Sequence, residues 1–331
     1  MPPTMKDVAA LADVSVKTVS RVVNGHPNIS AELRTRVSSA IEELQWQPNT
    51  HARSLRTGRT GLIALSLDDL RSPRLAQFAE ALVLEATRHD LQISLEPSRG
   101  RPERVGRTLS ALGSTFDGAI HLGPLPDDVL EDLDPTLPVV ALLTGGDAES
   151  PPPRVATLDV DETAAARLLG QHLRTLGADD ITILGLPATT PDAFTAALER
   201  EFPRSTVLRP ERRADRASGQ ALTEVLIAEG RTPGALVCAD DELAIGALSA
   251  LRQHGVAIPS RTLLTGHGNL PDGRFTTPSL TTIDIDIAEI ARHALDLLRA
   301  RRDDASRPPA RTLLPVNLLR GESTLGLGSA R

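Results

Sequence analysis

The chain has 331 residues, 40% of them hydrophobic, and a formal net charge of −7 at pH 7. That length is enough for two or three domains with sizeable cores. The single cysteine, Cys238, excludes an internal disulfide, and no apolar run is long enough to span a membrane. Because the chain also begins without a signal peptide, the sequence predicts a cytoplasmic protein that contacts no membrane.

Charge is distributed unevenly along the chain. Residues 1–60 contain eight Lys or Arg and five Asp or Glu, a net charge of +3, so the remaining residues carry −10 to reach the total of −7. A basic first segment can bind phosphates locally, while an acidic remainder is repelled by nucleic acid. The absence of tyrosine argues against aromatic platforms for single-stranded nucleic acid.

The stretch "TMKDVAALADV" predicts a first short helix. Thr4 and Asp7 have the spacing of a capping box. The expected inner face of the helix consists of Val8, Leu11 and Ala12. Residues 12–14 must then turn the chain sharply, and Asp13 tolerates the left-handed backbone that such a turn needs.

A second and a third helix are predicted to follow, in "SVKTVSRVVNG" and "SAELRTRVSSAIEELQW". Ser15 and Ser30 are placed to cap them. Spacings of three and four residues put a basic, polar set on one face of the second helix, namely Lys17, Ser20, Arg21 and Asn24. Its opposite, apolar face consists of Val19, Val22 and Val23. The third helix is expected to turn inward Leu33, Val37, Ala40, Ile41 and Leu44.

Three short helices, the second with a basic face, are typical of a helix-turn-helix unit whose second helix enters the major groove of DNA. The alternative is a small helical bundle with an ordinary solvated face. Helix spacing alone leaves both interpretations open.

The segment "QPNTHARSLRTGRTG" predicts a linker with one or two helical turns. Pro48 ends the preceding helix, and Asn49 can cap turns over residues 50–57. So short a helix is marginal in water and needs external support. Leu55, a large aliphatic side chain in a polar segment, has two interpretations: an anchor on the neighbouring domain, or an apolar wedge for the minor groove.

From residue 62 onward, short apolar runs alternate with amphipathic stretches, which indicates βαβ units and parallel sheets. The series resumes after the proline-rich stretch "GDAESPPPRVATLD", so we expect two similar α/β halves separated there, with a cleft at the carboxyl ends of their strands. The segment "RRDDASRPPAR" is expected to be an exposed loop.

The run "MKDVAALADVSVKTVSRVVNG", followed by "QPNTHARSLRTGRT" and an α/β body, closely resembles the LacI/GalR family of bacterial transcriptional regulators over essentially the whole chain. The resemblance implies a helix-turn-helix head (residues 1–47), a hinge helix and linker (48–60), and a bilobed body with two parallel-sheet α/β subdomains, similar to periplasmic binding proteins (61–331). It also implies a transcriptional regulator, expected to be a repressor, that binds a palindromic double-stranded DNA operator as a homodimer. A small effector in the cleft would modulate its affinity.

The resemblance also assigns DNA contacts to individual residues. Positions that match those facing operator bases and phosphates are Ser15, Val16, Lys17, Thr18, Ser20, Arg21 and Asn24. Positions that match backbone contacts are Thr4, Asn28, Ser30 and Asn49. Leu55 matches a leucine that family members insert into the operator, with Ala52 and Arg53 beside it. Asp13 replaces the family's usual glycine in the turn.

The effector site departs from the family pattern at several positions. Arg74 and Leu75 stand where an aromatic is usual, Leu143 replaces an acid, and Asp240 replaces an asparagine. An unmatched buried polar group costs about 1–3 kcal/mol, so these losses argue against an ordinary hexose as the effector. Polar residues that remain as candidate contacts are Asp68, Asp69, Arg74, His121, Asp240 and His267, and for each of them a surface or strand-end role is the alternative.

Three other functions remain as alternatives. An enzyme is disfavoured, because the sequence has no nucleophile elbow, phosphate loop, dinucleotide fingerprint or His-Glu-x-x-His pattern, and we expect no cofactor and no metal site. A transporter's solute-binding protein would need an export signal. A DNA-binding repressor with a vestigial cleft, independent of any effector, stays open.

Overall fold

The computed structural model describes residues 3–23, 29–46, 59–146, 154–326 and 328. It divides into two compact units, Met1–Thr60 and Gly61–Arg331, which are called here the head and the body. The predicted hinge helix over residues 50–57 lies outside the described residues.

The head contains the three predicted helices, α1 (Met5–Leu11), α2 (Val16–Val23) and α3 (Ala31–Glu43). They enclose a small core whose buried members are Val8, Ala9, Ala12, Val19, Val22, Val37, Ala40 and Trp46. One predicted core residue is wrong: Leu11 is 45% exposed at the end of α1, and Ala9 is buried in its place. The inner face of α1 is therefore rotated about the helix axis, away from Leu11 and toward Ala9.

Side chains near the helix ends satisfy free backbone groups of the head. The Asp7 carboxylate accepts hydrogen bonds from the backbone and the hydroxyl of Thr4, both at 2.7 Å. Ser30 accepts from the amide of Leu33 at 3.3 Å and caps α3, as predicted. Asp13 has a φ of +49°, the left-handed turn expected between α1 and α2.

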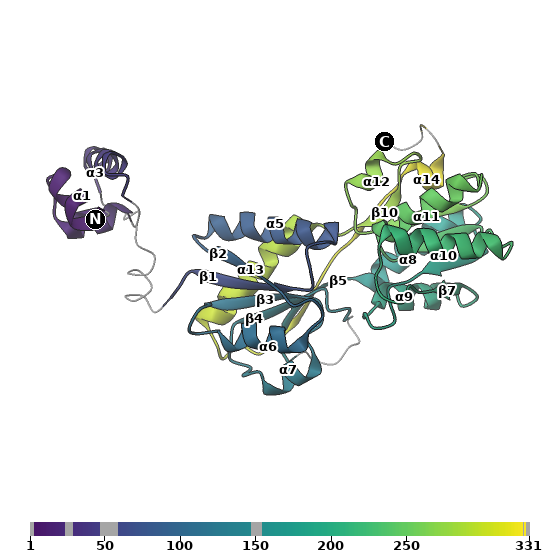
Figure 1. Ribbon diagram of the computed structural model, residues 1–331, viewed down its shortest axis with the longest axis horizontal. Helices are drawn as coiled ribbons and strands as arrows, with labels where there is room; N and C mark the ends of the chain where they lie inside the picture. The colour runs from purple at the N-terminus through teal and green to yellow at the C-terminus, as the bar shows by residue number, and fades with distance from the viewer. Residues whose placement is uncertain (1–2, 24–28, 47–58, 147–153, 327, 329–331) are drawn as a thin grey trace. The chain divides into compact units, whose positions relative to one another are not determined.

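The body contains two six-stranded sheets (Figure 1). In the first sheet the order is β11-β5-β4-β3-β1-β2, and every pairing is parallel. Its strands are β1 (Leu62–Leu67), β2 (Gln92–Pro97), β3 (Gly118–Leu122), β4 (Val139–Leu142), β5 (Ala156–Val160) and β11 (Arg311–Leu314). The central strands β3 and β4 are buried along their whole length, which explains their continuous apolar sequences.

In the second sheet the order is β12-β10-β9-β8-β6-β7, and only the edge strand β12 runs antiparallel to its neighbour. Its strands are β6 (Ile181–Leu184), β7 (Thr206–Leu208), β8 (Ala235–Cys238), β9 (Leu263–His267), β10 (Thr281–Asp284) and β12 (Asn317–Leu319). Each sheet with its helices is called a lobe below.

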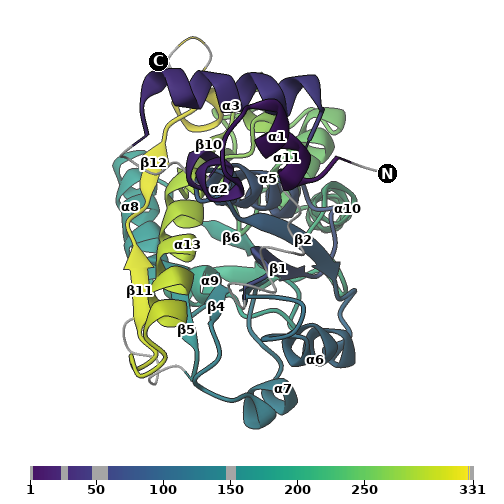
Figure 2. The same cartoon turned by 90° about the vertical axis from the view of Figure 1, so that its left-hand side faces the viewer.

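Helices cover both sheets. Those of the first lobe are α5 (Pro73–Arg88), α6 (Pro102–Ser110), α7 (Asp127–Asp132) and α13 (Ile287–Asp303). Those of the second are α8 (Glu162–Thr175), α9 (Ala193–Glu201), α10 (Arg216–Ala228), α11 (Asp241–Gln253), α12 (Asp272–Phe275) and α14 (Glu322–Leu325). Although α13 follows the second lobe's β10 in the chain, it packs on α5, β3, β4 and β5 of the first lobe (Figure 2).

Two expectations about the body need correction. The proline-rich stretch separates β4 from β5, which both belong to the first sheet, so it does not divide the lobes. The chain instead crosses between lobes three times, after β5, after β10 and after β11. The expected loop at 301–311 begins inside α13, where Arg301 is buried and donates hydrogen bonds to the carbonyls of Arg307 and Pro135.

Among the described helices, none combines the length and the apolar character needed to cross a membrane.

Candidate functional site

The outer face of α2 is the first candidate site. Lys17 and Arg21 are exposed, and neither forms an ion pair within the described residues. Val16 is 41% exposed beside them, whereas Val19 and Val22 on the opposite face are buried in the head core. The helix therefore presents two unneutralised cations and one apolar side chain to solvent.

The other residues predicted on this surface fall into three groups. Ser15 and Thr18 stabilise the start of α2, because the Ser15 hydroxyl accepts from the amide of Thr18 at 3.0 Å and hydrogen-bonds its hydroxyl at 2.8 Å. Ser20 is half-buried, and Thr4 and Ser30 lie at the beginnings of α1 and α3. Residues outside the described part of the chain are Asn24, Asn28, Asn49, Ala52, Arg53 and Leu55.

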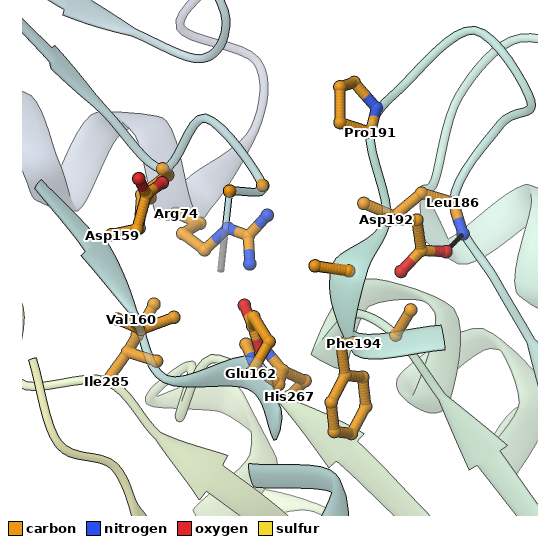
Figure 3. A pocket seen from close by; sticks show the side chains of 15 residues that line it. Arg74, Asp159, Val160, Glu162, Leu186, Pro191, Asp192, Phe194, His267 and Ile285 are labelled. Atoms are coloured by element: carbon orange, nitrogen blue, oxygen red, sulfur yellow. Dashed lines mark hydrogen bonds and ion pairs between the residues drawn. The ribbon is translucent and has the colours of Figure 1, made fainter. Parts of the chain in front are cut away.

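The second candidate site is a cleft between the lobes of about 530 Å³, counting the part that is open to solvent (Figure 3). Its lining residues are Arg74, Leu143, Gly145, Gly146, Asp159, Val160, Glu162, Leu186, Pro191, Asp192, Ala193, Phe194, Ala239, His267 and Ile285. Several of them lie at or just after the carboxyl ends of β4, β5, β8 or β9, which is the strand end at which a parallel sheet usually binds its ligand. Of the six predicted contacts, Arg74 and His267 are in this lining.

Arg74, in the first turn of α5, reaches across the cleft to the second lobe. Its Nη2 lies 3.4 Å from Oδ2 of Asp240, which precedes α11. Both residues depart from the family pattern, and the structure brings them into contact. The sequence identified each of them, but not their pairing.

His267, at the end of β9, has a side chain that is only 3% exposed. Its Nε2 lies 2.9 Å from Oε2 of Glu162, and its ring packs against Phe194 with the centroids 4.6 Å apart. Burial alone would lower the pKa of His267, but the charge and the hydrogen bond of Glu162 raise it above its ordinary value. The lining of the cleft therefore contains a hydrogen bond between the His267 ring and the Glu162 carboxylate.

The neighbour of Asp240 points away from the cleft. Asp241 is fully buried and accepts hydrogen bonds from the Thr282 hydroxyl at 2.7 Å and the Leu270 amide at 2.6 Å. Burial raises the pKa of Asp241 to about 6 even though both hydrogen bonds favour the carboxylate. Nothing in the stretch "ADDE" indicates which acid pairs with Arg74 and which lies in the core.

Three predicted contacts lie elsewhere. Asp68 is exposed and outside the lining. His121 is buried between strands, with its ring nitrogens 2.9 Å from the Ser66 hydroxyl and 3.3 Å from the Pro124 carbonyl, and burial lowers its pKa to about 4. Asp69 forms ion pairs with Arg71 at 2.6 Å and, across the lobes, with Arg213 at 3.1 Å. Although burial opposes it, these arginines hold the pKa of Asp69 well below its ordinary value.

Among the charged and aromatic side chains of the lining, the sequence missed four: Asp159, Glu162, Asp192 and Phe194. Asp159 is the last but one residue of the buried strand β5 and accepts from the amide of Thr144 at 2.5 Å; burial raises its pKa. Asp192 caps α9 and accepts from Arg209 at 2.9 Å. Carboxylates at the end of a buried strand were the available signal, since "ATLDVDET" contains Asp159 within β5 and Glu162 two residues after it.

Comparisons with known proteins agree with this architecture. Residues 4–49 match the family model described as bacterial regulatory proteins, lacI family, and residues 171–324 match a periplasmic binding protein-like domain. The HTH-type transcriptional regulator GalR of Salmonella typhimurium is 30% identical over 97% of this chain and 95% of its own. The ribose operon repressor of Halalkalibacterium halodurans is also 30% identical, over 98% and 97%.

Among solved structures, the lac repressor dimer bound to operator and the anti-inducer ONPF superposes with a TM-score of 0.82. It has 25% sequence identity and coverage of 98% of this chain and 99% of that one. A helix-turn-helix head joined to a two-lobed α/β body defines a DNA-binding transcriptional regulator with a ligand-binding body. The chain belongs to the LacI family of bacterial regulatory proteins.

Proposed function

We propose that this protein is a repressor that binds a palindromic operator as a homodimer and responds to a small-molecule effector in the interlobe cleft. The observation that carries the DNA-binding half is the outer face of α2, where Val16, Lys17 and Arg21 are exposed over a core of buried valines. Binding chromosomal DNA would place the protein in the bacterial cytoplasm.

In this proposal α2 reads bases in the major groove. Lys17 and Arg21 can donate to O6 and N7 of guanine, and Val16 can contact a thymine methyl group. Thr4, Asn28, Ser30 and Asn49 would contact the DNA backbone and fix the register. Leu55, flanked by Ala52 and Arg53, would enter the minor groove at the operator centre.

Exposed apolar side chains on the body support the homodimer. Leu84 on α5 is 60% exposed, Val225 on α10 is 52% exposed, and Phe275 at the end of α12 is 86% exposed. Large side chains of this kind are stabilised when a second copy covers them. Two heads held by such a dimer would meet two half-sites of an inverted repeat, which is why a palindrome is expected.

The cleft supports the effector half of the proposal. It lies between lobes that the chain joins by three crossings, so a ligand that contacts both lobes changes the energy of their relative movement. An altered lobe arrangement would change the spacing of the two heads, and therefore the affinity for DNA.

The test is selection of bound fragments from a random double-stranded DNA pool by the full chain, followed by gel-shift titration. We expect an inverted repeat to be enriched and Arg21→Ala to weaken binding to it. Arg107→Ala, an exposed arginine of the body, is the matched control and should bind like the wild type. A pool without any enriched inverted repeat at moderate salt would refute the proposal.

A further inference from the structure

The carboxylates that line the cleft are already neutralised by the protein itself. Asp192 is paired with Arg209 at 2.9 Å, Glu162 with His267 at 2.9 Å, and Asp159 with Arg311 at 3.7 Å. Asp159 and Asp192 also accept backbone hydrogen bonds, from Thr144 and Leu186 respectively. An anion entering the cleft therefore meets acids whose charge is largely balanced.

Arg74 is held less tightly than Asp192 and Glu162, whose ion pairs measure 2.9 Å. Within the described residues it forms an ion pair with Asp240, and the 3.4 Å between Nη2 and Oδ2 exceeds the roughly 2.7–2.9 Å of a good charge-assisted hydrogen bond. The side chain is 21% exposed, and Figure 3 shows its guanidinium directed toward the middle of the cavity. Most of its five N–H donors remain available to a ligand.

Asp240 does not depend on Arg74. Its Oδ1 accepts from the amide of Glu242 at 2.8 Å and caps α11, so the carboxylate stays hydrogen-bonded at a helix N-terminus when Arg74 turns away. Gly268 lies beside Arg74 and has no side chain there; a Cβ added to it would lie 3.5 Å from Cδ of Arg74, in van der Waals contact. Arg74 can therefore leave Asp240 for a ligand while the Asp240 carboxylate keeps its hydrogen bond to the Glu242 amide.

The rest of the lining is apolar. Side chains without polar atoms come from both lobes, namely Leu143, Val160, Leu186, Pro191, Phe194 and Ile285. A ligand that fits this surface has an apolar or ring-shaped body next to the group that Arg74 binds.

We propose that the effector is a small organic anion, whose carboxylate or phosphate group binds Arg74 and displaces Asp240 from it. The planar guanidinium fork matches both oxyanions with two parallel hydrogen bonds. This inference rests on the proposed function in one respect, that the cleft is the effector site. It makes Arg74 and Asp240 the residues that determine the charge of the accepted ligand.

The experiment measures thermal unfolding of the full chain with potassium phosphate or potassium acetate against potassium chloride at constant ionic strength. The same measurement is made with glucose 6-phosphate and glucuronate against glucose. We expect the anionic member of at least one pair to raise the Tm of the wild type more than the neutral or chloride reference does. The phosphate and carboxylate arms identify which oxyanion is preferred.

Variants assign the effect to the pair. Arg74→Gln should abolish the anion-specific rise, and Asp240→Asn, which keeps the helix cap, should strengthen anion binding about tenfold, equivalent to ~1.4 kcal/mol. Arg74→Lys keeps the charge without the fork, so it should retain a weakened response, and it replaces Arg74→Gln should that variant fail to fold. Arg71→Gln makes the same charge change outside the lining and should respond like the wild type.

An equal rise in Tm of the wild type and Arg74→Gln with every anion would overturn the inference. So would a rise in Tm with glucose as large as that with glucose 6-phosphate and with glucuronate. Either result would leave the repressor proposal intact, because operator binding by the wild type is measured separately by gel shift. Loss of operator binding would refute the repressor proposal without touching the anion response.

Discussion

Asp240 and Asp241 are neighbours in the chain, but their side chains lie in different surroundings. Asp240 faces Arg74, whereas Asp241 lies in the core against Thr282 and the Leu270 amide. Burial of Asp241 without a cationic partner in direct contact makes its charged form costly.

That cost predicts a pH dependence of stability. The folded pKa of Asp241, about 6, is above its unfolded value of 3.8, so the native state binds the proton more tightly. The contribution of Asp241 to the unfolding free energy is therefore highest below pH 4, falls as the pH rises from about 4 to 6, and no longer changes above pH 6. A pKa difference of about two units between the folded and unfolded states corresponds to about 3 kcal/mol.

Asp241→Asn removes the titrating group and can still pair with Thr282 and Leu270. In urea titrations at pH 4 to 7, the unfolding free energy of the wild type should drop by up to about 3 kcal/mol relative to the variant. Parallel pH profiles for the two proteins would contradict the assignment.

A second prediction at the scale of single residues concerns Lys17 on α2. If it donates to guanine, Lys17→Ala should reduce discrimination at one base position by about 1–3 kcal/mol, because the lost contact is specific to that base. Gel shifts with a set of single-base operator variants measure this. A uniform loss of affinity at all sequences would instead make Lys17 a phosphate contact.

At the scale of elements, α10 and α11 cross so closely that only glycine fits at the contact. A Cβ on Gly246 would lie 1.9 Å from the carbonyl oxygen of Arg216, and one on Gly219 would lie 2.1 Å from that of Leu243. Neither clash involves a flexible side chain, so the helices themselves would have to separate.

Gly246→Ala should therefore destabilise the body by about 3 kcal/mol or more, measured by chemical denaturation. Gly106→Ala is the matched control: it lies inside α6, where the nearest atom to an added Cβ is 3.8 Å away. Alanine there should stabilise the protein by about 0.5–1 kcal/mol, since it favours the helix. A mild effect of Gly246→Ala would show that the two helices can move apart easily.

At the scale of the whole molecule, the sequence predicted the elements better than their assembly. Buried parallel strands such as β3 and β4 have apolar runs that identify them directly. The sheet to which β5 belongs could not be read, because the proline-rich stretch before it suggested a boundary and nothing local specifies a strand's partners. Arg74 with Asp240, and Asp69 with Arg213, meet only because the lobes are folded against each other.

These two ion pairs link the lobes directly, so weakening one should shift the balance between closed and open bodies. The pair of Asp69 and Arg213 is partly exposed and worth about 1 kcal/mol or less, which limits the change in the open fraction to about fivefold. Arg213→Gln should increase that fraction, because Asp69 keeps only its partner in the same lobe, Arg71.

Spin labels on Ser110→Cys in the first lobe and Gln253→Cys in the second report the distance between lobes, since the native Cys238 is buried. Mixing with unlabelled chain keeps the measurement within one copy. We expect a broader distribution shifted to longer distances in Arg213→Gln. Arg231→Gln, which breaks an ion pair within the second lobe, should leave the distribution unchanged. Identical distributions in all three proteins would mean that packing, rather than charge, holds the lobes together.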